Sequence, residues 1–337
     1  MHNQFLKTNS NMKYIKLICI PILFFAFSCN SPKKDETKAI KDELALLDVK
    51  IRKEPKNPDL YYARSKVLLD KGKLKESLMD IQTAIDFDKK NVKYYVRKAD
   101  ILFASGETTL SFSALQEALK YDNKSTEAYL KSAELALLLK DYDKTMFNVN
   151  EVLKLDKINP TAYYLRGWAL KEKGDTIHAV QSYKKAIELK PDYEQPFEEL
   201  GLLYALKGDR LAIDYLNSTI NINPKNLNAM YALGLFYQDH SMIQKALETY
   251  QNILTVEPNH ADALHNVGYI NLVEKKSYQD ALTLFTKAIQ ADTNFLEAYF
   301  NRGITYEKLN DPQKAKQDFK KVLEIQPNHK LAKQHLR

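Results

Sequence analysis

Residues 160–193 read PTAYYLRGWALKEKGDTIHAVQSYKKAIELKPDY, and this stretch holds two short helical patterns joined at a glycine. In the first pattern, Tyr163 and Gly167 are four residues apart, which places them on one helix face. Gly174 follows at the position where a helix end favours a left-handed backbone. Pro191 ends the second pattern, because proline lacks the N–H that a helix interior needs. The stretch therefore predicts a helix–turn–helix unit whose helices are each too short to be stable alone.

The same template of 34 residues recurs along most of the chain of 337 residues. Eight copies follow one another, at residues 58–91, 92–125, 126–159, 160–193, 194–226, 227–260, 261–295 and 296–329. The fifth copy lacks one residue in its inner turn, and the seventh has one more. Residues 39–57 predict an N-terminal capping helix, and residues 330–337 predict the start of a C-terminal one. Such an array is stabilised mainly by contacts between neighbouring repeats.

The eighth position of every copy holds a small residue: Ser65, Ala99, Ala133, Gly167, Gly201, Gly234, Gly268 and Gly303. A larger side chain there would force the two helices apart at a cost of about 1–3 kcal/mol. Together with the large residues at the fourth, eleventh and twenty-fourth positions, this pattern resembles the tetratricopeptide repeat (TPR) family. The resemblance implies an all-α fold, a TPR α-solenoid. Its expected form is a right-handed superhelix of about eight helix–turn–helix repeats with capping helices, whose first helices line a concave groove.

The N-terminal residues predict an export signal. A signal peptide is expected over residues 1–28, with Met12 as the true start because Lys13 and Lys16 then precede the apolar run. That run, residues 17–27, is shorter than the about 20 residues that a membrane-spanning helix needs. It ends at Ala26-Phe27-Ser28-Cys29, which resembles a bacterial lipobox and implies that Cys29 is lipidated. The alternative is an ordinary signal peptide in which Cys29 has no special role.

The residues after Cys29 indicate where in the cell the protein lies, and the overall charge indicates which classes of partner it can bind. Residues 29–38 predict a lipidated polar tether; Lys34-Asp35-Glu36 resembles a tag for the outer cell surface, although a solvated linker has the same composition. We expect an outer-membrane lipoprotein of a Gram-negative cell envelope, facing the periplasm or the surface. Loss of the three lysines before residue 17 lowers the formal charge from +7 to +4, which is too weak and dispersed for a nucleic-acid surface.

No arrangement of residues in the sequence predicts catalysis, a cofactor or a metal site. The chain lacks a glycine-rich phosphate loop and a His-Glu-x-x-His motif, and no cysteine is available as a nucleophile. His260 and His265 are five residues apart across a turn, and His329 and His335 are six residues apart. Neither spacing places two imidazoles on one helix face, as a metal site would need. The sequence therefore predicts a binding protein rather than an enzyme.

The family resemblance implies that certain positions of each first helix line the groove. Carried over to this sequence, they give the candidate partner-binding residues Tyr164, Trp168, Glu198, Glu199, Tyr231, Leu235, His265, Tyr269 and Phe300. Aromatic linings suit extended peptides or apolar helix faces, although Trp168 fits equally well as a packing residue. The last four repeats place six acids at these positions against one lysine: Glu198, Glu199, Asp239, Asp262, Glu297 and Glu307 against Lys308. We therefore expect a partner segment that is basic or neutral.

Two functions of different classes follow from this surface. The first is a non-enzymatic, lipid-tethered scaffold that holds a protein partner during envelope assembly or maintenance, with the membrane reached through the lipid alone. The alternative is a glycan- or peptidoglycan-binding module, because aromatics with carboxylates also bind sugars. The carboxylate clamp of chaperone-tail binders is not expected, because no repeat has lysine at position five with asparagine at nine. Arg97, Asn266 and Asn301 stand isolated in the sequence.

Overall fold

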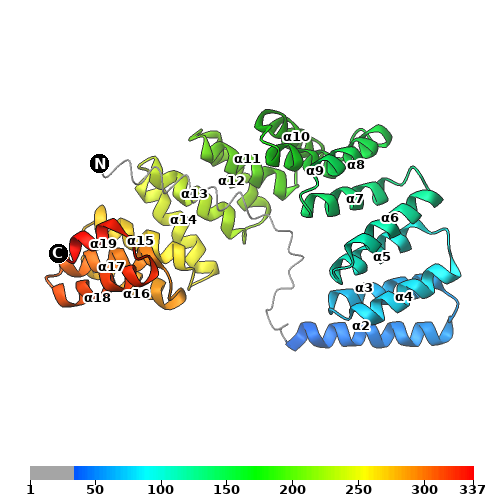
Figure 1. Ribbon diagram of the computed structural model, residues 1–337, viewed down its shortest axis with the longest axis horizontal. Helices are drawn as coiled ribbons and strands as arrows, with labels where there is room; N and C mark the ends of the chain where they lie inside the picture. Colours follow the sequence, from blue (N-terminus) through cyan, green and yellow to red (C-terminus); the bar gives the residue numbers. More distant parts are fainter. Residues whose placement is uncertain (1–33) are drawn as a thin grey trace. The chain divides into compact units, whose positions relative to one another are not determined.

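The computed structural model describes residues 34–337, and all of its secondary structure is helical (Figure 1). The predicted signal peptide and Cys29 lie outside the described residues. The helices are α2 (Lys34–Lys53), α3 (Pro58–Asp70), α4 (Leu74–Phe87), α5 (Val92–Ala104), α6 (Thr108–Tyr121), α7 (Thr126–Leu138), α8 (Tyr142–Leu155), α9 (Pro160–Glu172), α10 (Thr176–Leu189), α11 (Glu194–Leu206), α12 (Leu211–Ile222), α13 (Leu227–Asp239), α14 (Ile243–Val256), α15 (Ala261–Val273), α16 (Tyr278–Ala291), α17 (Leu296–Lys308), α18 (Pro312–Ile325) and α19 (Lys330–His335). The predicted all-α fold of repeated helix pairs is confirmed.

The helix before the array is longer than the pattern predicts. Helix α2 begins at Lys34, five residues ahead of the expected start and inside the stretch interpreted as a tether. Residues 34–38 contain neither glycine nor proline, and acids near a helix N-terminus interact favourably with its dipole. The stretch therefore continues the helix instead of remaining extended. No helix in residues 34–337 is long and apolar enough to cross a membrane.

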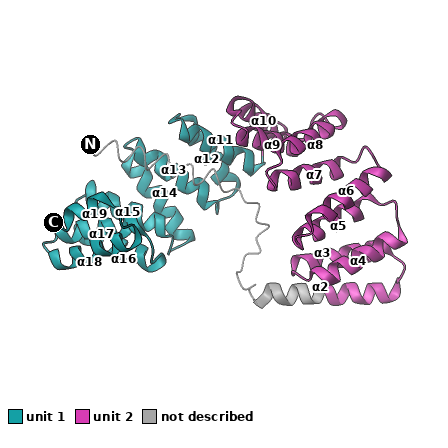
Figure 2. Ribbon diagram, in the orientation of Figure 1, with its two compact units in different colours: residues 1–20, 192–337 teal, residues 21–191 magenta. Residues whose placement is uncertain are grey.

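The helices form two units (Figure 2). Among the described residues, unit 2 comprises residues 34–191 with α2 to α10, and unit 1 comprises residues 192–337 with α11 to α19. Inside each unit, the second helix of a pair packs against the first helix of the next pair. Successive first helices also touch, as in α3–α5–α7–α9 of unit 2 and in α15–α17 of unit 1.

A left-handed residue closes each inner turn between the two helices of a pair. Gly174 has φ of +83° and Lys140 has φ of +59°, so the conformation is kept where glycine is absent. The next N–H then donates to a carbonyl five residues earlier, as in Asp175 to Leu170 (2.9 Å), except in the seventh repeat, where Ser277 donates to Asn271 six residues earlier (2.8 Å). This is the pattern of a Schellman C-cap. The same left-handed conformation occurs at Gly72, Gly106, Gly208, Ser241, Lys276 and Asn310.

The two helices of a pair approach closely at the eighth position, and two packing solutions occur there. In the last five repeats glycine faces a bulky side chain of the second helix: a Cβ on Gly234 would lie 2.5 Å from the Tyr250 ring. Leu216 takes the place of the ring opposite Gly201. In the first three repeats the residue at the corresponding second-helix position is Ile81, Leu115 or Val149, and the eighth position is serine or alanine. Small and large residues are therefore matched in pairs across the contact.

Hydroxyl groups add to the close contact in unit 2. Ser77 donates to the carbonyl of Ser65 (2.6 Å), and Ser111 donates to the carbonyl of Ala99 (2.8 Å). Both serines are fully buried, where a polar group needs a partner. The hydrogen bond crosses from the second helix to the first, so it ties the pair together at the point of closest approach.

Tyrosines at the fourth position close the turns between repeats of unit 2. Each hydroxyl donates to the carbonyl six residues earlier: Tyr61 to Pro55 (2.8 Å), Tyr95 to Lys89 (2.9 Å), Tyr129 to Asn123 (3.4 Å) and Tyr163 to Lys157 (3.2 Å). In unit 1 the same position holds Phe197, Met230, Leu264 and Tyr299. Three of these four lack a hydroxyl. Among the described residues, this hydrogen bond from tyrosine to the turn carbonyl, here called the tyrosine lock, therefore occurs in unit 2.

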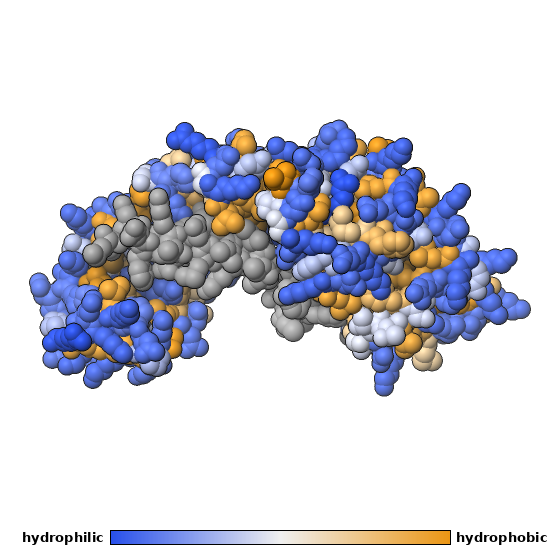
Figure 3. All heavy atoms as spheres, turned by 45° about the horizontal axis from the view of Figure 1, so that its top comes forward, coloured by the Kyte–Doolittle hydropathy of each residue, from blue (hydrophilic) through white to orange (hydrophobic). Residues whose placement is uncertain are grey.

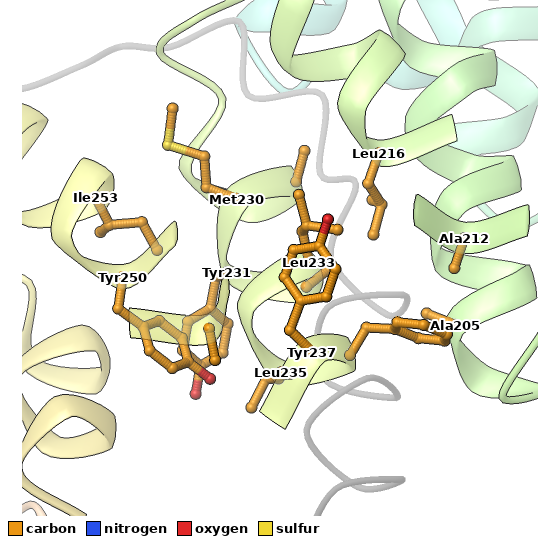
Figure 4. Packing of buried hydrophobic residues seen from close by; sticks show 14 of the residues in the cluster. Ala205, Ala212, Leu216, Met230, Tyr231, Leu233, Leu235, Tyr237, Tyr250 and Ile253 are labelled. Carbon is orange, nitrogen blue, oxygen red and sulfur yellow. The ribbon is translucent and has the colours of Figure 1, made fainter. Parts of the chain in front are cut away.

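The largest buried cluster of unit 1 surrounds α13 (Figure 4). Residues 229–237 of this helix are all buried, as expected of a helix that is apolar on every face. Figure 4 shows Tyr231 and Tyr250 side by side, with Leu216 and Ala212 approaching from α12. The outer surface, in contrast, carries charged side chains with apolar ones between them (Figure 3).

Candidate partner-binding surface

The candidate residues of unit 2 are Tyr164 and Trp168, which lie one turn apart on α9. Their ring centroids are 5.9 Å apart, and Tyr164 also contacts the Tyr183 ring at 6.0 Å. Tyr164 is 7% exposed and Trp168 is 6% exposed. Of the two interpretations of Trp168, the burial supports packing, and little of either ring is left for a partner.

In unit 1, three more candidates are buried and two of them belong to a polar network. Tyr231, Leu235 and His265 are all less than a tenth exposed. The Nδ1 of His265 lies 3.0 Å from the Oδ1 of Asn266, whose amide donates to the Tyr231 hydroxyl (3.3 Å). The Nδ2 of Asn301 lies 2.9 Å from the Nε2 of His265. This polar network joins α13, α15 and α17 and brings together Asn266 and Asn301, which belong to no carboxylate-clamp pattern in the sequence.

The polar network surrounds both nitrogens of the His265 ring: Nδ1 faces the Asn266 amide oxygen and Nε2 faces the Asn301 amide nitrogen. Burial and the nearby Asp262 carboxylate raise the pKa of Tyr231 well above its ordinary value. The phenol therefore stays protonated at neutral pH. The sequence feature that could have predicted this polar network is asparagine at the sixth position of two successive repeats, Asn266 and Asn301.

The carboxylates of the fifth repeat have amide partners. Glu199 is 5% exposed, whereas Glu198 is partly exposed. The Nδ2 of Asn226 donates both to Glu194 (2.7 Å) and to Glu198 (2.9 Å). Burial raises the pKa of Glu198; the Glu199 and Glu194 charges add to this rise, and the Asn226 hydrogen bond partly offsets it. Ionised Glu198 is thus held in an environment that favours a positive neighbour.

The remaining candidates, Tyr269 and Phe300, are partly exposed. Tyr269 packs against the buried cluster of Leu272, Ala281 and Phe285, and burial raises its pKa. The Phe300 ring lies 5.7 Å from that of Phe319. With Glu198, they are the members of the candidate set that offer a partner the most side-chain surface. Partner binding by the set stays a prediction.

The first-helix surface of unit 2 carries charges that are paired with one another. Lys131 lies 3.1 Å from Asp100 and 2.7 Å from Glu134. Burial alone would lower the pKa of Lys131, but the Glu134 and Asp100 carboxylates outweigh it and raise the pKa. Arg97 also approaches Asp100, at 3.4 Å.

Two histidines that the sequence left as loop residues have a structural role. His260 Nδ1 accepts from the Ala263 N–H (3.3 Å), and His329 Nδ1 accepts from the Ala332 N–H (3.1 Å). Both therefore act as helix N-caps, for which the signal was their position directly before a repeat start. Burial lowers the pKa of His329, which keeps its acceptor nitrogen free of a proton. Among residues 34–337, no group of three or more His, Cys, Asp or Glu side chains is placed to hold a metal ion.

Sequence models of the tetratricopeptide repeat match residues 169–208, 231–296 and 296–329. The chain is 29% identical over 180 residues to a TPR repeat-containing protein of Methanocaldococcus jannaschii, covering 48% of this chain and 32% of that protein. It is 30% identical over 120 residues to protein O-mannosyl-transferase Tmtc3 of Drosophila melanogaster, covering 35% of this chain and 13% of that protein. The chain thus spans about a third or less of these relatives.

Solved structures show the same fold. The C-terminal part of a TPR repeat-containing protein from Cytophaga hutchinsonii superposes with a TM-score of 0.60 at 20% identity, covering 73% of this chain and all of that one. At that identity the likeness concerns the fold alone. The sequence matches assign tetratricopeptide repeats to the three matched stretches, and the stacked helix pairs of the described residues have the fold of a TPR α-solenoid.

Proposed function

We propose that this protein is a non-enzymatic scaffold, tethered by a lipid on Cys29 to the outer membrane of a Gram-negative bacterium, that holds a basic or neutral segment of a partner protein. The proposed binding surface is the first-helix face of unit 1. The tetratricopeptide repeats support the general role, and the charges of α11, α13, α15 and α17 support the choice of partner.

A single observation carries the proposal. The partly or fully exposed acids of this face include Glu198, Asp262 and Glu297, and none of these three forms an ion pair with a lysine or arginine in the described part of unit 1. Glu198 accepts a hydrogen bond from the Asn226 amide, and Asp262 lies near the Tyr231 hydroxyl. A cationic segment would supply the missing charge, and its binding would weaken as salt screens the attraction.

The envelope location is supported by sequence alone. The apolar run over residues 17–27 ends at a cysteine in a lipobox-like context. Multiple acyl chains give durable membrane attachment, whereas one chain gives marginal attachment. A Cys29→Ala variant is expected to move from the membrane to the soluble fraction when cells are fractionated. A variant that remains with the membrane would exclude the lipid anchor.

The names of the relatives do not assign an activity to this chain. Five curated relatives are named transferases, but the matches cover only 8–19% of their lengths. The repeats account for nearly all of residues 58–329. This leaves binding as the function that the described residues support.

Cross-linking and pull-down of the full-length chain from membranes test the binding surface. The variant Glu198→Gln/Asp262→Asn/Glu297→Gln removes three charges from the first-helix face. The control Asp214→Asn/Glu248→Gln/Asp280→Asn removes the same charge from exposed positions of the second helices of unit 1. We expect one protein partner, retained by the control and lost from the first variant.

Two outcomes would contradict this scheme. Retention on purified cell-wall sacculi without a protein partner would favour the glycan-binding alternative. A partner that binds more tightly as salt is added would exclude charge attraction as the basis of recognition. Loss of the partner in both triple variants would show that the first-helix face has no special role.

A further inference from the structure

Four repeats have a cation at the seventh position of their first helix. These residues are Arg64, Lys98, Arg166 and Arg302. Each of them donates to a second-helix residue sixteen positions away in the sequence. Sixteen positions forward lies the second helix of the same repeat, and sixteen back lies that of the preceding repeat. The seventh position therefore lies between two second helices, away from the first-helix face.

In the first and eighth repeats this cation is paired with carboxylates. Arg64 donates through Nε and Nη2 to Asp80 and through Nη1 to Asp48, each at 2.7 Å. Arg302 donates twice to Asp318, at 2.8 Å and 2.7 Å. Arg64 and its two carboxylates line a hollow formed by α2, α3 and α4. The space between two second helices thus accommodates a carboxylate on the arginine.

Arg166 of α9 holds the same position without a carboxylate. Its Nε donates to the Ser182 hydroxyl (3.1 Å), and its Cζ lies 4.8 Å from the centroid of the Tyr163 ring. Sixteen positions back stands Asn150, where Arg64 has Asp48. Arg166 forms no ion pair with a carboxylate in residues 34–337, so its positive charge is uncompensated.

The terminal nitrogens of Arg166 are open to a ligand from outside. Arg166 is partly exposed. Among the described residues, its Nη atoms do not belong to the buried polar atoms that lack a partner. Solvent therefore reaches them, and an external acceptor can replace that solvent.

The surface beside Arg166 offers an apolar contact as well. Helix α9 packs against both α8 and α10 (Figure 1). On the outer side of α8, Asn150 lines a hollow together with Phe147, which is 60% exposed. Lys154 lines the same hollow and is paired with Glu151 (2.5 Å), so this pair adds no net charge. The surface combines one free cation with an exposed aromatic ring.

We propose that Arg166 is a docking site for a side-chain carboxylate of an acidic protein segment, on the outer side of unit 2 between α8 and α10. The carboxylate takes the place that Asp48 and Asp80 hold at Arg64, and Phe147 packs against an apolar neighbour of the acid. Carboxylates form strong, charge-assisted hydrogen bonds with a guanidinium, and a tyrosine ring against its face leaves the edge available. The site is independent of the proposed function, because it lies in the other unit and takes a ligand of opposite charge.

Fluorescence anisotropy on the full-length chain in detergent tests the site. The probe is a labelled peptide of alternating leucine and glutamate with both ends blocked, and its counterpart has glutamine in place of glutamate. We expect the glutamate peptide to bind, and Arg166→Gln to weaken its binding about ten- to a hundredfold, since a charge-assisted hydrogen bond is lost. Phe147→Ala should weaken it less. Arg210→Gln, the same change at an exposed arginine of unit 1, should leave it unchanged.

A second pair of variants tests whether the carboxylate occupies the predicted place. Ser182→Asp puts an internal carboxylate where Asp80 and Asp318 stand in their repeats, and should reduce binding as far as Arg166→Gln does. Gln181→Asp adds the same charge at the neighbouring, exposed position and should retain most of the binding. Equal losses in these two variants would show that overall charge decides the affinity, and would overturn the site. Equal binding of the glutamate and glutamine peptides would also overturn it, as would equal losses in Arg166→Gln and Arg210→Gln.

Melting temperatures distinguish docking from a merely structural role. Arg64→Gln breaks a complete set of ion pairs and should lower the melting temperature. Arg166→Gln removes only the hydrogen bond to Ser182 and should leave it nearly unchanged, whereas Ser182→Asp should raise it by supplying the missing carboxylate. A fall in Arg166→Gln as large as that in Arg64→Gln would show that Arg166 serves the fold, and would overturn the proposal.

Discussion

Units 2 and 1 use the same repeat but pack the two helices of each pair differently. The first three repeats of unit 2 place serine or alanine at the eighth position opposite an aliphatic residue, and buried hydroxyls bridge the helices. The four repeats of unit 1 place glycine there opposite Leu216, Tyr250, Phe285 or Phe319. Repeat four, at the end of unit 2, already has the glycine solution with Tyr183. What the fold requires is the combined volume of the pair, and not a particular residue at either position.

The polar groups of the two units differ in the same way. Unit 2 neutralises its first-helix charges with one another, as Lys131 does with Asp100 and Glu134. In unit 1 the Asn226 amide satisfies Glu194 and Glu198 on the first-helix face, while Asp318 of α18 pairs with Arg302. A hydrogen bond from an amide leaves the negative charge in place, whereas an ion pair cancels it. The repeat therefore fixes where these positions lie, and the side chains decide which charge a partner meets.

The largest effect is expected where the volume match is broken. In Gly234→Ala the new Cβ would lie 2.5 Å from the Tyr250 ring, which is fully buried and has no free space to move into. Overpacking of this kind costs about 1–3 kcal/mol. Hydrogen exchange followed by mass spectrometry should show faster opening of α13 and α14, while α5 and α6 of unit 2 stay protected.

A second substitution tests whether volume is the cause. Gly234→Ala/Tyr250→Leu recreates in unit 1 the alanine–leucine pair that Ala99 and Leu115 form in unit 2. The double variant should recover part of the protection lost in Gly234→Ala. If it is less protected than Gly234→Ala, the two packing solutions are not interchangeable and the volume argument fails.

The sequence was sufficient to predict the helix pairs of the repeat, but it was insufficient to predict which side chains of the first helices are exposed. The spacing of Gly167, Gly174 and Pro191 predicts a helix pair, because close contact, turn and helix end each demand a residue type. The burial of Tyr231 and His265 could not be predicted, because the fifth position lies beside side chains of the next repeat and its exposure depends on their size. The polar network depends on atoms of three helices, and no pattern within one helix encodes it.

A smaller effect is expected at the inner turns, where unit 2 has one strained position. Lys140 adopts φ of +59° with an exposed side chain, and a left-handed conformation costs an ordinary residue about 1–2 kcal/mol. Lys140→Gly should therefore slow the opening of α7 and α8 in hydrogen exchange. Gly174→Ala, at the matching turn of the next repeat, should speed the opening of α9 and α10. Opposite signs are required; equal signs would mean that backbone strain does not decide these turns.

The tyrosine locks between repeats should contribute about 0.5–1.5 kcal/mol each, the net value of one hydrogen bond. Tyr95→Phe removes the bond from the hydroxyl to the carbonyl of Lys89 (2.9 Å) and should destabilise unit 2 by that amount in urea unfolding. Tyr299→Phe changes the equivalent residue of unit 1, whose hydroxyl forms no such turn bond in the described structure, and should have almost no effect. If both variants lose the same stability, the turn bond is not what distinguishes the units.

The smallest effect is a pH dependence of stability that has opposite signs at two carboxylates, Glu198 of unit 1 and Glu76 of unit 2. Burial, with the Glu199 and Glu194 charges, raises the pKa of Glu198 above its ordinary value of 4.5. Its protonated form is then favoured in the folded state, so its stabilising contribution is present at low pH and is lost as pH rises through the folded pKa. In unit 2, hydrogen bonds from its own backbone N–H and from Lys73 lower the pKa of Glu76, so that carboxylate stabilises at neutral pH and its contribution is lost as pH falls.

Melting curves of Glu198→Gln and Glu76→Gln, recorded with the wild type across the carboxyl titration range, separate these contributions. As pH rises, Glu198→Gln should gain stability relative to the wild type, because it cannot acquire the buried charge. Glu76→Gln should lose stability relative to the wild type over the same interval, because it cannot acquire the favourable one. Curves that shift in the same direction would show that the carboxylates of both units are compensated alike, and the uncompensated charge that recommends unit 1 as the surface for a basic partner would then be absent.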